Sequence, residues 1–183
     1  KKIYQDLSNE FSAIEPPIWA AMLAQHCRSN GFGSQILDCE AERINYIESA
    51  QIIKDVNPRI VCFVVYGQQP SASTQNMHGA VALADELKKI APNLRTLFVG
   101  GHVAALPRET LREPSIDMIC QNEGVYTISG LLSINNLDDQ SQISKVKGLG
   151  YKVDGTPVLN EPSPIVSKKD LSRDLPGMAW DLL

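Results

Sequence analysis

Glycines follow three apolar segments of the chain, at points where a ligand could approach the backbone. They are Gly67, the pair Gly100 and Gly101, and Gly124. Because glycine carries no Cβ, a ligand can lie against the main chain at such positions. An isolated glycine pair more often makes a tight turn, but the same pattern after three segments favours binding. It suits a large, flat ligand that lies across several strand ends.

Hydroxyl-bearing residues follow Gly67 within a few positions. Pro70 introduces the sequence Ser71-Ala-Ser-Thr74, which predicts the start of a helix with Ser and Thr capping free backbone N–H groups. In open α/β sheets, ligands bind at the carboxyl ends of the strands, beside the point where the strand order reverses. This loop is therefore a candidate ligand contact, with an ordinary strand–loop–helix connection as the alternative.

A buried strand must position these residues. The segment 60–65 is apolar throughout, without alternation, which is typical of a central strand in a parallel sheet. The predicted strands are 2–7, 35–39, 60–65, 97–99 and 116–120, and the predicted helices are 18–30, 45–56, 73–90, 107–113 and 126–134. This alternation predicts an α/β fold with a doubly wound (Rossmann-like or flavodoxin-like) five-stranded parallel sheet in the order 2-1-3-4-5.

The character of the chain changes after residue 137. Asp154-Gly155 lies between two apolar runs and predicts a β-hairpin, and the following segment 161–176 has the proline and charge of a linker. The last residues are apolar again. We expect residues 1–137 to form the ligand-binding domain, and residues 138–183 to form a β-hairpin and a linker towards a further domain that is absent from this chain.

Charge and cysteine spacing argue against several classes of function. The formal net charge is −4 without a basic run, which is a poor match to nucleic acid or to an anionic membrane surface. The chain has no apolar stretch of transmembrane length, and we expect no signal peptide. The four cysteines are not spaced as in a zinc site, an iron–sulfur site or a redox pair. We expect a reduced, cytoplasmic setting.

Three common ligands of such a sheet fit the sequence poorly. The turn after the first predicted strand, 8–15, has no glycine and so lacks the G-x-G-x-x-G pattern of a dinucleotide site. Glu10 and Glu15 in the same turn would repel the phosphate of a flavin mononucleotide. A phosphoacceptor receiver needs a lysine after the fifth strand, where Gln121-Asn-Glu-Gly124 offers none.

Four segments carry a resemblance to a known family, namely 15–24, 66–77, 100–107 and 122–124. They resemble the N-terminal cobalamin-binding domain of cobalamin-dependent radical S-adenosylmethionine (SAM) enzymes. The segment 176–183 is similar to the connection that leads into the radical SAM barrel of those enzymes. The resemblance extends over essentially the whole chain. It implies a corrin ring over the strand ends and a nucleotide tail inserted between strands and helices.

The resemblance also implies a set of cofactor contacts. They are Glu15, Tyr66, Gly67, Ser71, Ser73, Thr74, Gly100, Gly101, His102, Val103, Glu123 and Gly124. The hydroxyl residues would bind the tail or its phosphate, and the glycine pair would let the tail pass the backbone. His102 would hydrogen-bond the tail or an amide, and the remaining residues after the strands would border the corrin or its amides. The loop that contains Glu15 would face the cobalt.

We expect the cobalt to have no protein ligand. Better-known cobalamin domains carry D-x-H-x-x-G after the first strand, with the histidine on cobalt, and this chain has no histidine there. Its three histidines are His26, His78 and His102. We expect base-off cobalamin, no metal-ligating side chain and no catalytic residue in this chain.

The implied partners include a domain outside this chain. Family members bind a [4Fe–4S] cluster with C-x-x-x-C-x-x-C and use SAM, and this chain lacks that motif, so we expect it to be non-catalytic alone. The implied parent is a methyltransferase that uses methylcobalamin, with a C-terminal radical SAM domain. A cofactor-free Rossmann-like interaction or regulatory module, and the nucleotide-sugar-binding half of a glycosyltransferase, are the alternatives.

Overall fold

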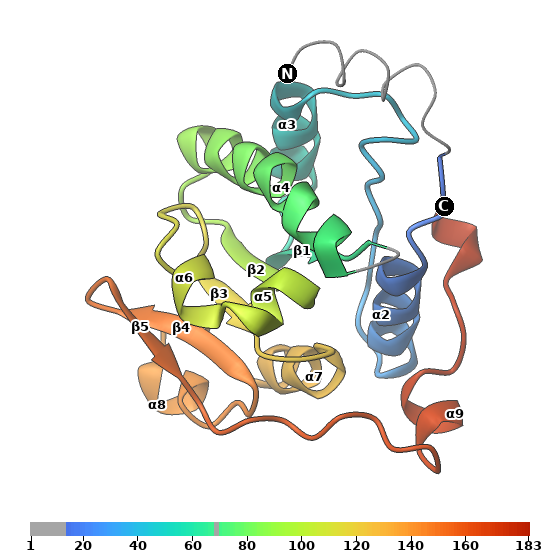
Figure 1. The fold of residues 1–183 in the computed structure, drawn as a ribbon, viewed down its shortest axis with the longest axis vertical. Helices are drawn as coiled ribbons and strands as arrows, with labels where there is room; N and C mark the ends of the chain where they lie inside the picture. Colours follow the sequence, from blue (N-terminus) through green and yellow to red (C-terminus); the bar gives the residue numbers. More distant parts are fainter. Residues whose placement is uncertain (1–13, 68–69) are drawn as a thin grey trace.

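The computed structural model describes residues 14–67 and 70–183, which form an α/β fold around one five-stranded sheet (Figure 1). The strands are β1 (Ile60–Val65), β2 (Arg95–Gly100), β3 (Met118–Cys120), β4 (Leu149–Val153) and β5 (Thr156–Leu159). The helices are α2 (Ile18–Ser29), α3 (Tyr46–Val56), α4 (Pro70–Ile90), α5 (Gly101–Ala105), α6 (Pro107–Thr110), α7 (Val125–Ser133), α8 (Gln140–Ile143) and α9 (Leu171–Asp174), with a 3-10 helix η1 (Trp180–Leu182). No helix in these described ranges is long and apolar enough to cross a membrane.

The strands β1, β2 and β3 form the parallel part of the sheet. β1 lies beside β2 from Ile60, opposite Arg95, to Val65, opposite Gly100, and β3 lies on the other side of β2. The three corresponding predicted strands and their relative order are confirmed. β1, which we expected to be a central strand, is instead the outermost strand of the sheet within the described residues. Because the strands are parallel, their carboxyl ends meet at one edge of the sheet, which we call the carboxyl edge.

Helices cover both faces of these strands. On one face, α2 and α7 pack against Leu97 and Val99 of β2. On the other face, α3, α4 and α5 pack against Phe63 of β1 and Phe98 of β2, whose rings stack at 4.5 Å between centroids. Successive residues of β2 therefore serve opposite faces, as the two-residue period of a strand requires.

The order and direction of the other strands differ from the prediction. The β4–β5 hairpin pairs antiparallel with β3, so the sheet is mixed and its order is β1-β2-β3-β4-β5. The hairpin itself is confirmed, and its turn residues Asp154 and Gly155 have φ values of 50° and 76°, as a two-residue turn of this kind needs. The free edge of β3 presents unpaired backbone groups, and the hairpin satisfies them because it returns the chain beside that edge.

The prediction of a strand at 35–39 was wrong, since this segment forms no strand within the described ranges. Cys39 packs at the margin of the core instead, and its Sγ accepts a hydrogen bond from Ser49 of α3 at 3.2 Å. A β-strand exists only through pairing, and no described strand pairs with this segment. The predicted strand 2–7 lies outside the described residues.

The helices lie close to their predicted positions. α2, α3 and α7 match to within one residue at each end, α4 begins at Pro70 rather than at residue 73, and α6 is shorter than predicted. The start of α3 is specified locally. The side chain of Asn45 accepts hydrogen bonds from the N–H groups of Ile47 and Glu48, and the Glu48 carboxylate accepts one from the Asn45 N–H.

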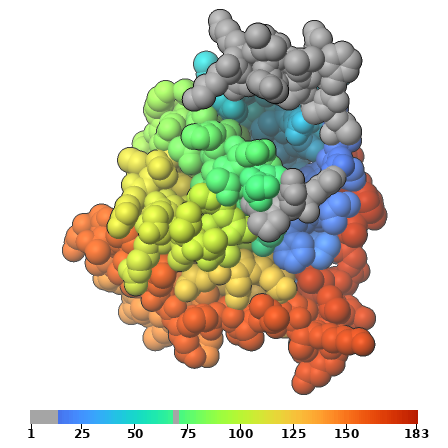
Figure 2. All heavy atoms as spheres, in the orientation of Figure 1, coloured from blue at the N-terminus to red at the C-terminus, as the bar shows by residue number. Residues whose placement is uncertain are grey.

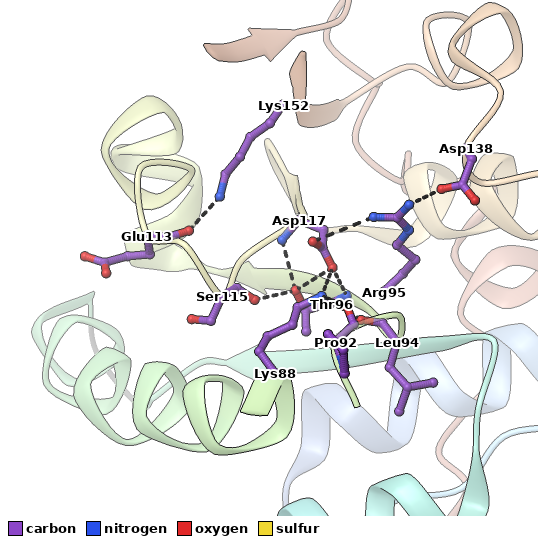
Figure 3. Close-up of polar contacts among 10 residues, drawn as sticks. All are labelled: Lys88, Pro92, Leu94, Arg95, Thr96, Glu113, Ser115, Asp117, Asp138 and Lys152. Atoms are coloured by element: carbon purple, nitrogen blue, oxygen red, sulfur yellow. Dashed lines mark hydrogen bonds and ion pairs between the residues drawn. The ribbon is translucent and has the colours of Figure 1, made fainter. Parts of the chain in front are cut away.

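A polar cluster centred on Asp117 joins the amino ends of β2 and β3 (Figure 3). The Asp117 carboxylate accepts hydrogen bonds from the Lys88 ammonium of α4 at 2.6 Å and from the Thr96 N–H at 2.8 Å. The Thr96 hydroxyl donates to the Ser115 carbonyl at 2.7 Å. The cluster therefore fixes α4 and two strands at the edge of the sheet opposite to the carboxyl edge.

After β5 the chain runs past α7 and then along α2 (Figure 1). The Tyr126 hydroxyl of α7 donates to the Asp174 carboxylate at 2.6 Å, and the Ala179 N–H donates to the Ala21 carbonyl of α2 at 3.1 Å. This C-terminal segment is thereby attached to two helices that both begin at the carboxyl edge.

Candidate functional site

Most of the predicted contacts lie at the carboxyl edge, where α4, α5 and α7 begin (Figure 1). In the space-filling view, α4 (green) and α5 (yellow-green) lie side by side on the surface, with α2 (blue) on the same face (Figure 2). Glu15 is exposed and lies just before α2. The topology of the sheet therefore gathers loops that are far apart in the sequence.

Ser73 joins three elements at this edge. Its buried hydroxyl donates to the Val65 carbonyl at 2.5 Å and accepts a hydrogen bond from the His102 N–H at 3.0 Å. Gly100 lies beside Ser73, because an added Cβ at Gly100 would stand 3.3 Å from the Ser73 hydroxyl. The same Cβ would stand 2.7 Å from the carbonyl carbon of Val65 and closer still to the carbonyl oxygen. Ser73 and Gly100 therefore connect β1, β2 and the starts of α4 and α5 tightly.

Packing also accounts for two of the other glycines. An added Cβ at Gly67 would overlap the Cβ of Ala72 in α4. Gly124 has a φ of 86°, and its added Cβ would stand 2.9 Å from Cγ2 of Val99. These positions require glycine for the fold, whether or not a ligand lies beside them.

A polar surface remains exposed next to this tight connection. The Nδ1 atom of His102 lies 3.0 Å from the Thr74 hydroxyl, and Thr74 is exposed. At Gly101 the nearest atoms to an added Cβ lie 3.7 Å away, an ordinary contact, so the fold does not demand glycine there. Val103 is fully buried in the core and does not reach this surface. We call the surface between the starts of α4 and α5, lined by Thr74, Gly101 and His102, the slot.

Trp19 is a residue of this edge that the sequence did not reveal. Its ring centroid lies 5.2 Å from that of Tyr66 at an interplanar angle of 52°, and its Nε1–H donates to the Glu123 carbonyl at 3.2 Å. The indole thus reaches from the end of β1 to the end of β3. Burial raises the pKa of Tyr66 to about 12, so its hydroxyl stays protonated at neutral pH. Only the position of Trp19 within the segment 15–24 hinted at a role.

The loop after β3 binds the chain that follows β5. Gln121 Nε2 donates to the Asn160 carbonyl at 3.0 Å, Asn122 Nδ2 donates to the Ser163 carbonyl at 2.7 Å, and the Glu123 carboxylate accepts from the Val166 N–H at 2.8 Å. We call 160–166 the linker segment. Glu123, which we predicted at the corrin border, therefore has the linker segment as a hydrogen-bond partner.

Metal-ligating side chains do not gather here. Within 14–67 and 70–183, no group of three or more His, Cys, Asp or Glu side chains could hold a metal ion. His26 is buried, with ring nitrogens 2.5 Å from the Asp174 carbonyl oxygen and 2.6 Å from the Ser129 hydroxyl. Cavities of about 420 Å³ beside α7 and α8, and of about 260 Å³ beside the Asp117 cluster, contain none of the predicted contacts.

Comparison with known proteins identifies the family. Residues 4–132 match the B12 binding domain family. The chain is 31% identical over 169 residues to an uncharacterized methyltransferase of Pyrococcus horikoshii. This alignment covers 92% of this chain and 34% of that protein. It is 22% identical over 169 residues to the anaerobic magnesium-protoporphyrin IX monomethyl ester cyclase of Synechocystis sp. This alignment covers 92% of this chain and 32% of that protein. The chain thus spans about a third of the length of these relatives.

Two solved enzymes share the fold. One is OxsB, a cobalamin-dependent S-adenosylmethionine radical enzyme with aqua-cobalamin bound, at a TM-score of 0.67 and 17% identity over 96% of this chain and 23% of that chain. The other is TsrM, a radical S-adenosylmethionine methyltransferase of Kitasatospora setae with cobalamin and a [4Fe–4S] cluster bound. Its TM-score is 0.62 and its identity is 13%, and the match covers 85% of this chain and 28% of that chain. Together with the family match over most of its length, this fold shows that the chain belongs to the B12 binding domain family and resembles the cobalamin-binding domains of cobalamin-dependent radical SAM enzymes.

Proposed function

We propose that this domain carries cobalamin for a radical SAM methyltransferase, with the nucleotide tail of the cofactor in the slot. The observation that supports this most strongly is the Thr74–His102 pair beside Gly101. A tail with phosphate and ribose groups needs hydrogen-bonding side chains next to a stretch of backbone without side chains. The slot offers both at the edge of the sheet where ligands of open α/β folds bind.

In this assignment, each group of residues has a distinct task. Thr74, His102 and the exposed Ser71 hydrogen-bond the tail, and Gly101 lets it pass the backbone. The packing beneath them comes from Ser73, Gly100 and Val103, whereas Gly124 packs against Val99 on the opposite face of the sheet.

The corrin would lie over the ends of β1 and β3. Tyr66 and Gly67 border it from one side, Trp19 extends this border towards β3, and the loop with Glu15 faces the cobalt. When bound, cobalamin supplies a carrier for a methyl group. The chain's own residues bind and orient that carrier, and the half-buried Tyr66 and Trp19 rings limit the access of water.

The 183-residue chain should bind hydroxocobalamin about one to one, and Gly101→Trp should weaken binding by about a hundredfold. The indole would occupy the space of the tail, and the Cβ that carries it would make only ordinary contacts, at 3.7 Å from Ser73. The measurement is visible absorbance that co-elutes with the protein in gel filtration, followed by titration. The control is Gly33→Trp, since no atom lies within 4 Å of an added Cβ there. A chromophore retained by Gly101→Trp would place the tail elsewhere, and no binding by the wild type would contradict the proposed function.

Bound cobalamin should be base-off with no histidine on the cobalt. The side chains of Glu15 and Pro16, in the loop assigned to the cobalt, have no nitrogen donor, and a tail in the slot removes its own base from the metal. Electron paramagnetic resonance of the cob(II)alamin form tests this, because an axial nitrogen splits each cobalt line into a triplet. We expect no triplet. A triplet that disappears in His102→Ala would make His102 a ligand, and one that persists in alanine variants of all three histidines would indicate base-on cofactor outside the slot.

The radical chemistry belongs, in this proposal, to a C-terminal radical SAM domain of the same parent chain. It would bind a [4Fe–4S] cluster and SAM, as the longer relatives and the cluster in TsrM suggest. Residues 1–137 would then hold the cofactor, and residues 138–183, whose hairpin completes the sheet, would lead to that domain. Since its cysteines lack cluster spacing, this chain alone should cleave no SAM.

A further inference from the structure

The linker segment is attached to the loop after β3 at a regular interval. The three anchored positions are Asn160, Ser163 and Val166, and their partners are the consecutive side chains 121, 122 and 123. Two of the contacts use backbone carbonyls of the linker segment and the third uses a backbone N–H. Every side chain between β3 and Gly124 therefore binds a backbone group of the linker segment rather than one of its side chains.

The third of these contacts differs from the other two in strength. The Glu123 carboxylate accepts a hydrogen bond from a neutral backbone N–H at 2.8 Å, which makes the bond charge-assisted. Both groups are partly buried, so water replaces this contact less easily than it replaces one on the open surface. Glu123 is thus the residue among the three whose contact with the linker segment is charge-assisted.

Glu123 belongs to the carboxyl edge as well. Its carbonyl accepts the Trp19 indole N–H, and the Trp19 ring lies against Tyr66 at the end of β1. Gly124, directly after it, turns the chain into α7 with a positive φ. One residue therefore contacts the edge through its backbone and the linker segment through its side chain.

We propose that Glu123 is a positioning residue that couples occupancy of the cofactor edge to docking of the linker segment. The inference rests on the proposed cobalamin site. A cofactor that orders Tyr66, Trp19 and the loop after β3 also favours the geometry in which Glu123 accepts the Val166 N–H. Coupling between two binding events is reciprocal, so a docked linker segment raises cofactor affinity by the factor by which the cofactor stabilises docking. Whatever follows the linker segment is then held in one position when the cofactor is present.

Hydrogen exchange of the 183-residue chain, with and without hydroxocobalamin, measures the coupling directly. The Val166 amide should exchange at least about fivefold more slowly with cobalamin bound. Amides of the exposed hairpin turn at Asp154 and Gly155 should be unaffected and serve as the internal reference. This measurement needs no substitution.

Three variants then assign the coupling to the carboxylate. Glu123→Ala should lose the cobalamin-dependent protection of Val166 and bind cobalamin about fivefold more weakly, by the reciprocity stated above. Glu123→Gln keeps an acceptor oxygen for the Val166 N–H, so it should restore most of both effects. The matched control is Glu161→Ala, which removes a carboxylate of the same segment whose partner among the described residues is the exposed Lys147, and it should change neither quantity.

The outcomes separate this inference from the proposed function. If the wild type does not bind cobalamin, the proposed function fails and the coupling with it. If cobalamin binds but leaves Val166 exchange unchanged, or if Glu123→Ala keeps both protection and affinity, the coupling is wrong while the cobalamin site stands. If Glu123→Ala and Glu123→Gln both lose affinity while cobalamin still protects Val166, Glu123 contacts the cofactor directly and is not a positioning residue. If Glu123→Ala fails to fold, the wild-type exchange and the Glu123→Gln variant decide.

Discussion

Replacing Gly100 by alanine should destabilise the domain by about 3 kcal/mol or more. The added methyl group would meet the main chain of Val65, 2.7 Å from its carbonyl carbon, and neither strand can withdraw without breaking the β1–β2 pairing. It would also press against the Ser73 hydroxyl at 3.3 Å, which connects three elements at this edge. Cobalamin binding should be lost together with stability. Urea unfolding followed by circular dichroism gives the free energy of unfolding, and titration of the folded fraction gives the affinity.

Gly101→Ala is the matched control for this prediction. An added Cβ at Gly101 meets its nearest neighbours at 3.7 Å, and alanine is a better helix former than glycine at the start of α5. The variant should keep the wild-type free energy of unfolding to within about 0.5 kcal/mol. Equal unfolding midpoints for Gly100→Ala and Gly101→Ala would contradict the prediction, because they would show that the close approach of Gly100 to Val65 does not contribute to the stability of the domain.

Asp117→Ala should destabilise the domain by about 2–3 kcal/mol. The substitution removes the acceptor of the Lys88 ammonium and of the Thr96 N–H, and leaves both donors partly buried at the amino ends of β2 and β3. The Asp117 side chain is 20% exposed, so some of the loss is recovered by water. Because the cluster lies at the opposite end of the strands, cobalamin affinity of the folded protein should not change.

Asp138→Ala provides the comparison within the same cluster (Figure 3). Asp138 pairs with Arg95, but its side chain is 66% exposed, and exposed ion pairs contribute little. The free energy of unfolding should fall by about 0.5 kcal/mol or less. A loss as large as that of Asp117→Ala would mean that burial does not distinguish the two carboxylates.

Short-range patterns predicted the elements of the fold well. The apolar run 60–65 is a strand of the parallel part of the sheet, the amphipathic segment 45–56 is a helix that Asn45 caps in the structure, and Asp154-Gly155 turns the hairpin. Each of these depends on neighbours a few residues away, through side-chain burial, capping or backbone φ, so the local sequence carries the information. The prediction of a strand at 35–39 failed because a strand needs a pairing partner from elsewhere in the chain, which the local sequence does not specify.

The antiparallel end of the sheet was likewise beyond local patterns. The local sequence predicted the hairpin but not its partner strand. The hairpin pairs with β3, about 30 residues earlier, because β3 has a free edge. Hydrophobic alternation does not distinguish a separate hairpin from one that extends the sheet.

The site divides in the same way. By itself, the sequence determined that glycines follow three strands and that hydroxyl groups follow one of them, and parallel strands with short loops bring such residues to one edge. The tertiary structure alone decided how each is used: Ser73 is taken up by Val65 and His102, and Val103 is buried. Trp19 reaches Glu123 across 104 positions of the chain, and Glu123 reaches Val166 across 43. A single side chain satisfies its hydrogen bonds with whichever group the fold brings within about 3 Å, and local sequence does not specify that group.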